Sequence, residues 1–345
     1  MPGVFFAGNF LSKSTGVMGV GEELASHFTN AGWKVVTASQ HLGRVKRMVD
    51  FLWTAIHYRK EYDVVSVEVY SYLAFRWAEL LCFLLRILRK PYILTLHGGQ
   101  LPEFAHKYPH RFERLISTAS RVTTPSKYLH QTFLKYRPDI IYLPNGIDFN
   151  FLNHQVRSHA EPKLVWLRAF HEIYNPLMAA KVFYRVVSYY PNATLVMIGP
   201  DKNDGSSNAV KSYSLANNLM DKITFTGSVP KNQVGLFLSK GDIFLNTTNY
   251  ESFGVSVMEA AACGLCIVTT DAGELPYLWD DGVNALIVPR GDFAAMSEAV
   301  FRILTEPELS EKLSINSCLK AEEHDWSKII PLWENLLEQV ISDQF

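Results

Sequence analysis

Short apolar runs alternate with longer amphipathic stretches along almost the whole of this sequence, and this rhythm constrains the fold more than any other feature. Each run is short enough for one strand, and the stretches between the runs have the periodicity of helices. This alternation is typical of a parallel sheet that helices cover on both faces. The runs form two groups. The first group comprises 4–7, 34–38, 64–67, 92–96, 121–124 and 140–143, and the second comprises 163–167, 194–198, 223–226, 243–246, 266–269 and 285–288.

A polar segment without periodicity, at 149–162, separates the two groups of runs. A chain of 345 residues also exceeds the size of one typical domain core. We therefore predict an α/β protein with two doubly wound, Rossmann-like domains, at 1–155 and 156–324, whose ligands bind beyond the carboxyl ends of the strands. The last stretch, 325–345, is amphipathic, and we expect it to form a helix that packs back across the domain junction.

The charge of the chain is unevenly distributed. The net charge is −1, so we expect no binding of nucleic acid. Residues 1–150 nevertheless contain 18 Lys and Arg against 11 Asp and Glu, while residues 151–345 contain 15 against 23. A basic first half predicts that this half meets an anionic partner.

The four cysteines are too few and too scattered for a disulfide framework. Cys263 and Cys266 have CxxC spacing, but no second pair of ligands completes a zinc site, so we expect a buried, structural role. The N-terminus lacks the basic region of a signal peptide, and no apolar span reaches the ~20 residues that cross a bilayer. We therefore expect a cytoplasmic protein.

The segment 246–264 carries the chemistry that the sequence indicates most clearly. A strand precedes it, and we expect a helix that begins at Ser252 or Phe253 and ends at Gly264. The N-terminus of a helix presents free N–H groups and the positive end of the helix dipole, which suit a diphosphate. Gly254 would let such an anion approach the backbone closely.

Two carboxylates frame the start of this helix. Glu251 precedes the helix, and Glu259 lies about two turns inside it. A carboxylate accepts two hydrogen bonds at once, which suits a ribose diol or a pair of sugar hydroxyls. The alternative is that Glu251 caps the helix and that Glu259 is a solvated helix residue. The helix is apolar on most sides, however, so a buried Glu259 would need a partner.

The stretch from Glu251 to Glu259 resembles the E-x7-E signature of retaining glycosyltransferase family 4. Members of this family have the GT-B fold, in which two Rossmann-like domains face each other across a cleft. The resemblance implies that Glu251 contacts the donor sugar and that Glu259 binds the ribose of the nucleotide. It also implies that the donor binds to the backbone of Phe253, Gly254 and Val255.

The first domain carries fainter elements of the same resemblance. Gly16, in the glycine-containing turn 14–21, matches the family glycine that lets donor phosphate and acceptor approach, although such a turn alone usually indicates only a tight bend. His97 follows a predicted strand and matches a histidine beside the sugar, with a structural histidine as the alternative. Ser126 and Lys127 match a region that faces the acceptor.

The second domain departs from the family pattern at one point. Arg168 matches an arginine that holds the leaving diphosphate, but Tyr174 and Asn175 stand where the family has a second cation, a lysine. Either one of these neutral side chains substitutes for the lysine, or His171 or a lysine from elsewhere in the chain supplies the charge.

The sequence contains no Asp-x-Asp motif, with which other glycosyltransferases hold a metal-bound diphosphate. The resemblance therefore predicts an enzyme without metal or cofactor, with His97, Arg168 and Glu251 in its catalytic site. Its reaction would move a hexose from a nucleotide-diphosphate sugar, UDP rather than GDP, to a glycan or lipid-linked acceptor with retention of configuration. Cell-surface polysaccharide or lipopolysaccharide synthesis is the expected pathway. The alternatives are a GT-B nucleotide-sugar epimerase and a non-catalytic partner subunit.

Two stretches suggest contact with a membrane surface. Residues 44–60 form a basic amphipathic stretch with Trp53, and 75–90 is a second candidate. Either stretch would suit the anionic inner face of the cytoplasmic membrane, where a lipid-linked acceptor would be found. The alternative is that both apolar faces pack on the sheet.

Overall fold

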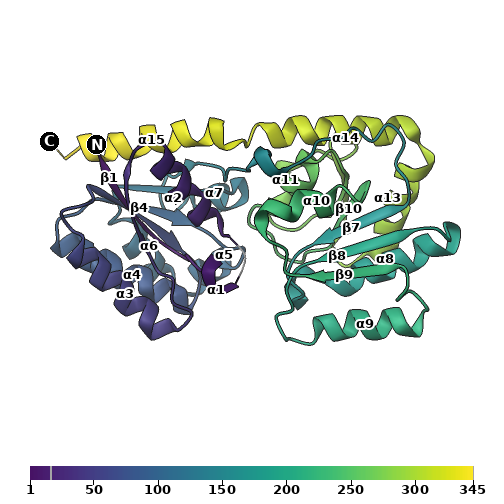
Figure 1. The fold of residues 1–345 in the computed structure, drawn as a ribbon. Coiled ribbons are helices and arrows are strands. Elements are labelled where there is room, and N and C mark those ends of the chain that lie inside the picture. Colours follow the sequence, from purple (N-terminus) through teal and green to yellow (C-terminus); the bar gives the residue numbers. More distant parts are fainter. Residues whose placement is uncertain (16–17, 345) are drawn as a thin grey trace. The chain divides into compact units, whose positions relative to one another are not determined.

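A computed structural model of the chain describes residues 1–15 and 18–344. The chain divides into two compact units, whose helices and strands are labelled in Figure 1. Unit 1 comprises Met1–Gly146 and Trp326–Phe345, and unit 2 comprises Ile147–Asp325.

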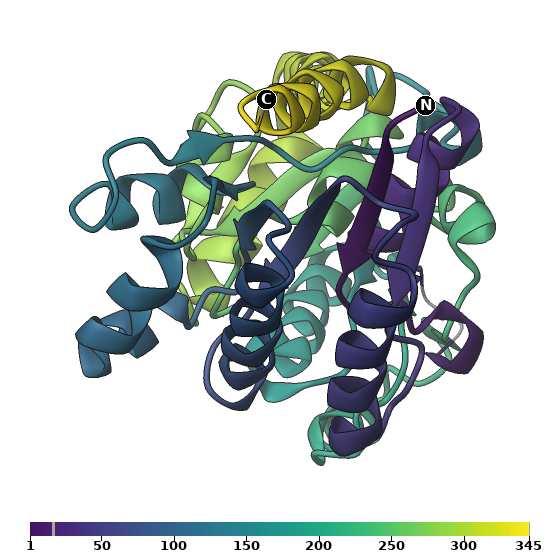
Figure 2. The same cartoon turned by 90° about the vertical axis from the view of Figure 1, so that its left-hand side faces the viewer.

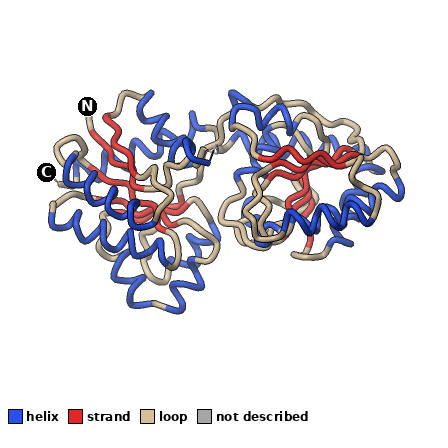
Figure 3. The backbone as a smooth tube through the Cα atoms, turned by 60° about the horizontal axis from the view of Figure 1, so that its bottom comes forward, coloured by secondary structure: helices blue, strands red, loops and turns tan. Residues whose placement is uncertain are grey.

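Unit 1 is built on a six-stranded parallel sheet with the strand order β2-β1-β3-β4-β5-β6. Every residue of β1 and β4 is buried, because helices cover both faces of the sheet and neither face needs polar side chains. Figure 3 shows the strands of each unit as a layer between helices. The strands of unit 1 are β1 (Gly3–Ala7), β2 (Lys34–Ala38), β3 (Val64–Val69), β4 (Tyr92–Leu96), β5 (Arg121–Thr124) and β6 (Ile141–Tyr142).

The helices of unit 1 connect these strands, and two of them, α3 and α4, lie side by side (Figure 2). Among residues 1–15 and 18–344, no helix combines the length and the apolar character that crossing a bilayer requires. The helices of unit 1 are α1 (Ser12–Thr15), α2 (Val20–Asn30), α3 (Arg44–His57), α4 (Leu73–Ile87), α5 (Leu101–Lys107), α6 (Pro109–Ile116), α7 (Lys127–Phe133) and α15 (Trp326–Ser342).

The last helix, α15, completes the core of unit 1. Its buried side chains Trp326, Trp333 and Leu337 join Phe6 and Phe28 in one hydrophobic cluster. One face of the first sheet is therefore covered by residues from the far end of the chain.

Unit 2 repeats the architecture with a second six-stranded parallel sheet, in the order β12-β11-β10-β7-β8-β9. Its strands are β7 (Lys163–Leu167), β8 (Thr194–Ile198), β9 (Ile223–Gly227), β10 (Ile243–Asn246), β11 (Cys266–Thr270) and β12 (Leu286–Val288). Its helices are η1 (Phe149–Phe151), η2 (Glu172–Tyr174), α8 (Pro176–Tyr189), α9 (Ser206–Ala216), η3 (Lys231–Gln233), α10 (Val234–Leu238), α11 (Val255–Ala262), α12 (Leu275–Leu278), α13 (Phe293–Thr305) and α14 (Pro307–Glu322).

The prediction of two doubly wound parallel sheets is confirmed. The units, however, divide at residue 147 rather than at 155. The segment 147–155 belongs to unit 2 because its backbone bonds there: Ile147 N donates to His324 O at 2.8 Å, and Gln155 N donates to Cys263 O at 3.2 Å.

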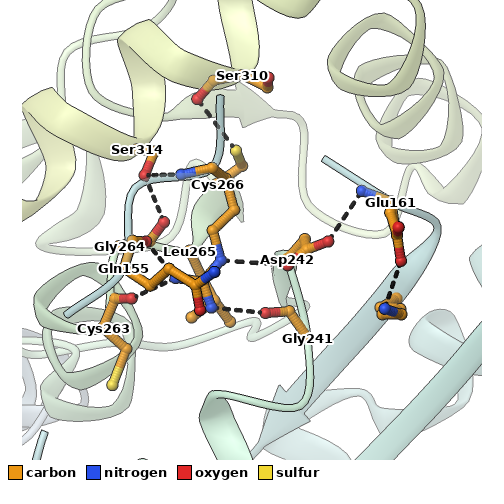
Figure 4. A network of polar contacts seen from close by, with 12 residues as sticks. Gln155, Glu161, Gly241, Asp242, Cys263, Gly264, Leu265, Cys266, Ser310 and Ser314 are labelled. Atoms are coloured by element: carbon orange, nitrogen blue, oxygen red, sulfur yellow. Dashed lines mark hydrogen bonds and ion pairs between the residues drawn. The ribbon is translucent and has the colours of Figure 1, made fainter. Parts of the chain in front are cut away.

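A buried arginine fixes the next residues to unit 2, in the polar network of Figure 4. Arg157 donates from Nε to Asp242 Oδ1 at 3.1 Å, from Nη2 to Gly241 O at 3.0 Å and from Nη1 to Cys263 O at 2.8 Å. Cys266, the other half of the CxxC pair, is buried, and its Sγ lies 3.3 Å from Ser310 O. Both cysteines therefore belong to the packed interior around this network.

Candidate functional site

Helix α11 begins at Val255, so the predicted start at Ser252 or Phe253 is wrong. The reason is Gly254, whose φ of 97° and ψ of 48° place it in the left-handed region, outside a helix. Gly254 is the N-cap, and its carbonyl accepts from Val257 N at 3.0 Å. The first N–H groups of α11 have no partner within the helix and are available at its N-terminus.

Glu251 is held just before this helix by contacts on two sides. Its carboxylate forms an ion pair with Arg168 and accepts from Ser252 N at 3.1 Å. Its carbonyl accepts from Glu274 N at 3.1 Å. Gly273 must be a glycine, since a Cβ there would lie 2.0 Å from the same carbonyl oxygen. Glu251 thus makes a local cap contact, as one interpretation had it, and also faces a cation.

Arg168 follows β7 and lies at the centre of the polar cluster. Its guanidinium lies 4.9 Å from the centre of the Tyr174 ring, in addition to its ion pair with Glu251. Burial lowers the pKa of Arg168, while electrostatic interactions with Tyr174 and Glu259 act in the opposite direction. Arg168 therefore responds to both carboxylates of the 251–259 stretch.

Glu259 is buried within α11, with 6% of its side chain exposed, and it has a partner. The ammonium of Lys231 forms an ion pair with it. Lys231 belongs to η3, which follows β9, and 23% of its side chain is exposed. Glu259 is therefore not a solvated helix residue, and Lys231 is the member of the cluster that the sequence motifs did not indicate.

The residues considered in place of the family lysine have other partners. Tyr174 lies against Arg168 through its ring. Asn175 is the N-cap of α8 in a left-handed conformation, with a φ of 46°. His171 Nδ1 lies 3.9 Å from Asp204 Oδ2. Lys231 is thus the second cation of this cluster, and it comes from a different loop.

Two buried polar atoms of the cluster have no hydrogen-bond partner within the described part of the chain: Arg168 Nε and Ser256 Oγ. Ser256 lies in the first turn of α11. Buried donors without partners are costly and usually mark a place where water or a ligand binds. Two cations, two carboxylates and a helix N-terminus together can hold an anion that also carries hydroxyl groups.

The predicted backbone contacts also lie in this cluster. Phe253 is 2% exposed, and its ring packs edge-on against His324 at 5.4 Å, so only its backbone is available to a ligand. Gly254 and Val255 cap and begin α11. Unit 2 therefore brings together the six residues predicted there: Arg168, Glu251, Phe253, Gly254, Val255 and Glu259.

In unit 1, His97 follows β4 and lies in a pocket with Glu68, Gly8 and Gly21. Its ring stacks on Tyr70 with 5.4 Å between the ring centres. Burial lowers the pKa of His97, and the nearby Glu68 opposes this shift. His97 is therefore a neutral imidazole near pH 7.

Glu68, at the end of β3, is a pocket residue that the sequence interpretation missed. Its Oε2 accepts from Asn9 N at 3.1 Å and from the Tyr70 hydroxyl at 3.0 Å. A Cβ at Gly8 or at Gly21 would lie 2.4 Å from its carboxylate, so both glycines make room for it. The available signal was its position, since an acid at the carboxyl end of a parallel strand lies where ligands bind.

The remaining predicted residues have different outcomes. Ser126 is the buried N-cap of α7, and its hydroxyl accepts from Leu129 N at 3.1 Å. The ammonium of Lys127 lies 5.7 Å from the centre of the Tyr142 ring. Gly16 lies outside the described residues.

The sequence matches two family models. Residues 152–318 match "Glycosyl transferases group 1", and residues 21–151 match "Glycosyltransferase Family 4". One similar curated protein belongs to the phosphatidylinositol N-acetylglucosaminyltransferase of Arabidopsis thaliana and is 32% identical over 116 residues. That alignment covers 33% of this chain and 25% of the relative, so the chain matches about a quarter of the relative's length.

The fold is similar to those of solved glycosyltransferases. Sucrose-phosphate synthase from Thermosynechococcus elongatus matches with a TM-score of 0.80 and 15% identity, over 99% of this chain and 100% of that chain. Anabaena Alr3699/HepE in complex with UDP-glucose matches with a TM-score of 0.73 and 16% identity, over 97% and 99%. With family models over residues 21–318 and two six-stranded parallel sheets, the chain belongs to the glycosyltransferases of GT-B fold.

Proposed function

We propose that this protein transfers a hexose from a nucleotide-diphosphate sugar to a glycan or lipid-linked acceptor, with retention of configuration and without a metal or cofactor. One observation carries the proposal: two ion pairs, Arg168–Glu251 and Lys231–Glu259, lie with the N-terminus of α11 in unit 2. This arrangement supplies cations for a diphosphate and carboxylates for hydroxyl groups.

Donor binding then proceeds by exchange of partners. The diphosphate takes the guanidinium of Arg168, the ammonium of Lys231 and the N–H groups of the first turn of α11. Glu251 is released to accept hydrogen bonds from sugar hydroxyls, and Glu259 accepts them from the ribose diol. The charges of the cluster are already in place before the reaction, so little reorganisation is needed as charge develops on the leaving diphosphate.

The proposed chemical step is a front-face substitution. The acceptor oxygen forms a bond to the anomeric carbon on the face from which the diphosphate leaves, and a phosphate oxygen takes the proton of the acceptor hydroxyl. A double displacement would need a carboxylate nucleophile at the anomeric carbon. Glu251 and Glu259 are both engaged with cations and suit hydrogen bonding to hydroxyls better. We assign the neutral His97 to a hydrogen bond with the transferred sugar.

UDP is the proposed donor nucleotide. The fold neighbour Alr3699/HepE is described in complex with UDP-glucose, which supports UDP over GDP. The phosphatidylinositol N-acetylglucosaminyltransferase relative supports a lipid-linked acceptor. We accordingly propose action at the inner face of the cytoplasmic membrane, in the synthesis of polysaccharide or lipopolysaccharide.

An exposed apolar surface on unit 1 supports the proposed membrane contact. On α3, Val49, Trp53 and Ile56 are exposed, and on the adjacent α4, Phe83 and Ile87 are 56% and 62% exposed. Other faces of the same helices pack on the sheet. Each helix therefore combines the two interpretations that the sequence left open.

The proposal is tested by a thermal-shift screen of nucleotides and nucleotide sugars, followed by product analysis. A ligand that binds only the folded state raises the melting temperature, and we expect UDP and UDP-sugars to do so. With an acceptor glycan, NMR should show a product with the anomeric configuration of the donor. No response to any nucleotide diphosphate contradicts the proposal. A changed sugar without an acceptor would indicate an epimerase, and binding without turnover a non-catalytic subunit.

A further inference from the structure

A groove of about 650 Å³ lies between α4 and α6 in unit 1, away from His97 and Glu68. Four arginines and one glutamate line it, among apolar side chains that include Leu80, Phe83 and Leu115. The groove is therefore cationic at its rim and apolar in part of its wall.

One of the four arginines has a structural role. Arg111 donates from Nε to Glu79 Oε1 at 3.0 Å, and its guanidinium lies 5.7 Å from the Phe75 ring and 5.9 Å from the Tyr108 ring. This pair neutralises the one acid of the groove and joins α4 to α6. Arg111 is thus already engaged.

The other three arginines, Arg76, Arg86 and Arg114, are exposed and form no ion pair within residues 1–15 and 18–344. Arg86 lies 5.7 Å from the Phe83 ring, which leaves its N–H groups available. Guanidinium groups bind phosphate oxygens in a two-pronged geometry, so three of them around one groove suit a phosphate ester.

The surroundings of the groove indicate where that phosphate comes from. Leu80, Phe83 and Ile87 are exposed on α4 beside the arginines, and Trp53 is exposed on the neighbouring α3. A free phosphate ester in solution gains nothing from this apolar surface, whereas a phospholipid presents a phosphate directly above an apolar layer. We infer that the groove between α4 and α6 binds the headgroup phosphate of an anionic phospholipid in a membrane.

This inference rests on the membrane contact proposed above and adds a specific headgroup site to it. The full chain would be sedimented with vesicles of phosphatidylcholine, with and without phosphatidylglycerol. We expect binding to the anionic vesicles only, and the Arg86→Gln/Arg114→Gln variant should lose about tenfold or more in affinity, as expected for two basic residues near an anionic surface. The Arg86→Lys/Arg114→Lys variant keeps the charge but not the fork and should bind with intermediate affinity.

The matched control is Arg44→Gln/Lys46→Gln on α3, which removes the same charge from exposed residues outside the groove. Equal losses in the two neutralised variants would overturn the groove site and leave general membrane attraction. Failure of the wild-type protein to bind any vesicle would overturn both. Binding of soluble glycerol phosphate that depends on the groove, without vesicle binding, would assign the site to a free anion and overturn the membrane source. Stabilisation by UDP should be unchanged in all variants, so these outcomes are independent of the donor test.

Discussion

The ammonium of Lys231 forms an ion pair with the buried carboxylate of Glu259, and the guanidinium of Arg168 forms one with Glu251. Because Glu259 also acts on the pKa of Arg168, the two pairs form one cluster. The cluster contains equal numbers of cations and carboxylates, so it is neutral before an anion binds. A diphosphate that displaces the carboxylates from the cations leaves them free for hydroxyl groups.

Replacing Lys231 tests the second cation. Lys231→Gln should weaken binding of UDP by about tenfold to a hundredfold, because a charged hydrogen bond to phosphate contributes roughly 1.5–3 kcal/mol. Isothermal titration calorimetry measures this change. The control is Lys240→Gln, whose ammonium lies 4.4 Å from the Phe237 ring. A loss in the control as large as in Lys231→Gln would assign the effect to general charge.

Arg168 and Glu251 should be essential for turnover. We expect Arg168→Ala and Glu251→Ala each to lower the rate of sugar transfer by about a hundredfold to a thousandfold, since preorganised electrostatic contacts of this kind have that effect. Circular dichroism should show both variants folded. Transfer at the wild-type rate in both variants would refute their place in the site.

Two glycines with nearly the same backbone conformation separate stability from ligand binding. Gly254 and Gly205 are N-caps with φ values of 97° and 92°. Alanine at either position should cost about 1 kcal/mol of unfolding free energy, measured with urea, because a left-handed conformation disfavours a Cβ. Only Gly254→Ala should also weaken UDP binding. Equal effects of the two substitutions on UDP affinity would remove Gly254 from the site.

The stability of unit 1 should decrease as the pH falls through the ordinary titration range of histidine. Burial lowers the pKa of His97 below its ordinary value of 6.5. In the interval between these values the unfolded chain binds a proton that the folded chain does not, so acid favours unfolding. Urea unfolding of the wild type and of His97→Gln at about pH 7.5 and about pH 5.5 should show a smaller loss in the variant. The same loss in both proteins would contradict a buried, neutral His97.

The cysteines should be unreactive in the folded protein. Burial raises the pKa of Cys263 and Cys266 to about 12 and that of Cys318 to about 11, and the thiolate is the reactive form. Iodoacetamide should therefore modify these residues only after denaturation, as followed by mass spectrometry. Rapid modification of native Cys263 or Cys266 would support a redox role for the CxxC pair.

The strands were predictable because a strand buried on both faces has to be an apolar run, as β1 and β4 are. The start of α11 was predicted too early because the left-handed conformation of Gly254 cannot be read from residue types alone. Lys231 was missed for a different reason. It meets Glu259 only because the loop after β9 and helix α11 come together in the folded unit, and the sequence spacing carries no sign of that meeting.

The contribution of α15 to the core of unit 1 has a consequence for synthesis. Unit 2 is one continuous segment and can fold as soon as it has left the ribosome, whereas unit 1 waits for Trp326, Trp333 and Leu337 to cover Phe6 and Phe28. The first residues to be translated are therefore among the last to be sealed from water. During that interval a chaperone would find its binding surface on the nascent sheet of unit 1.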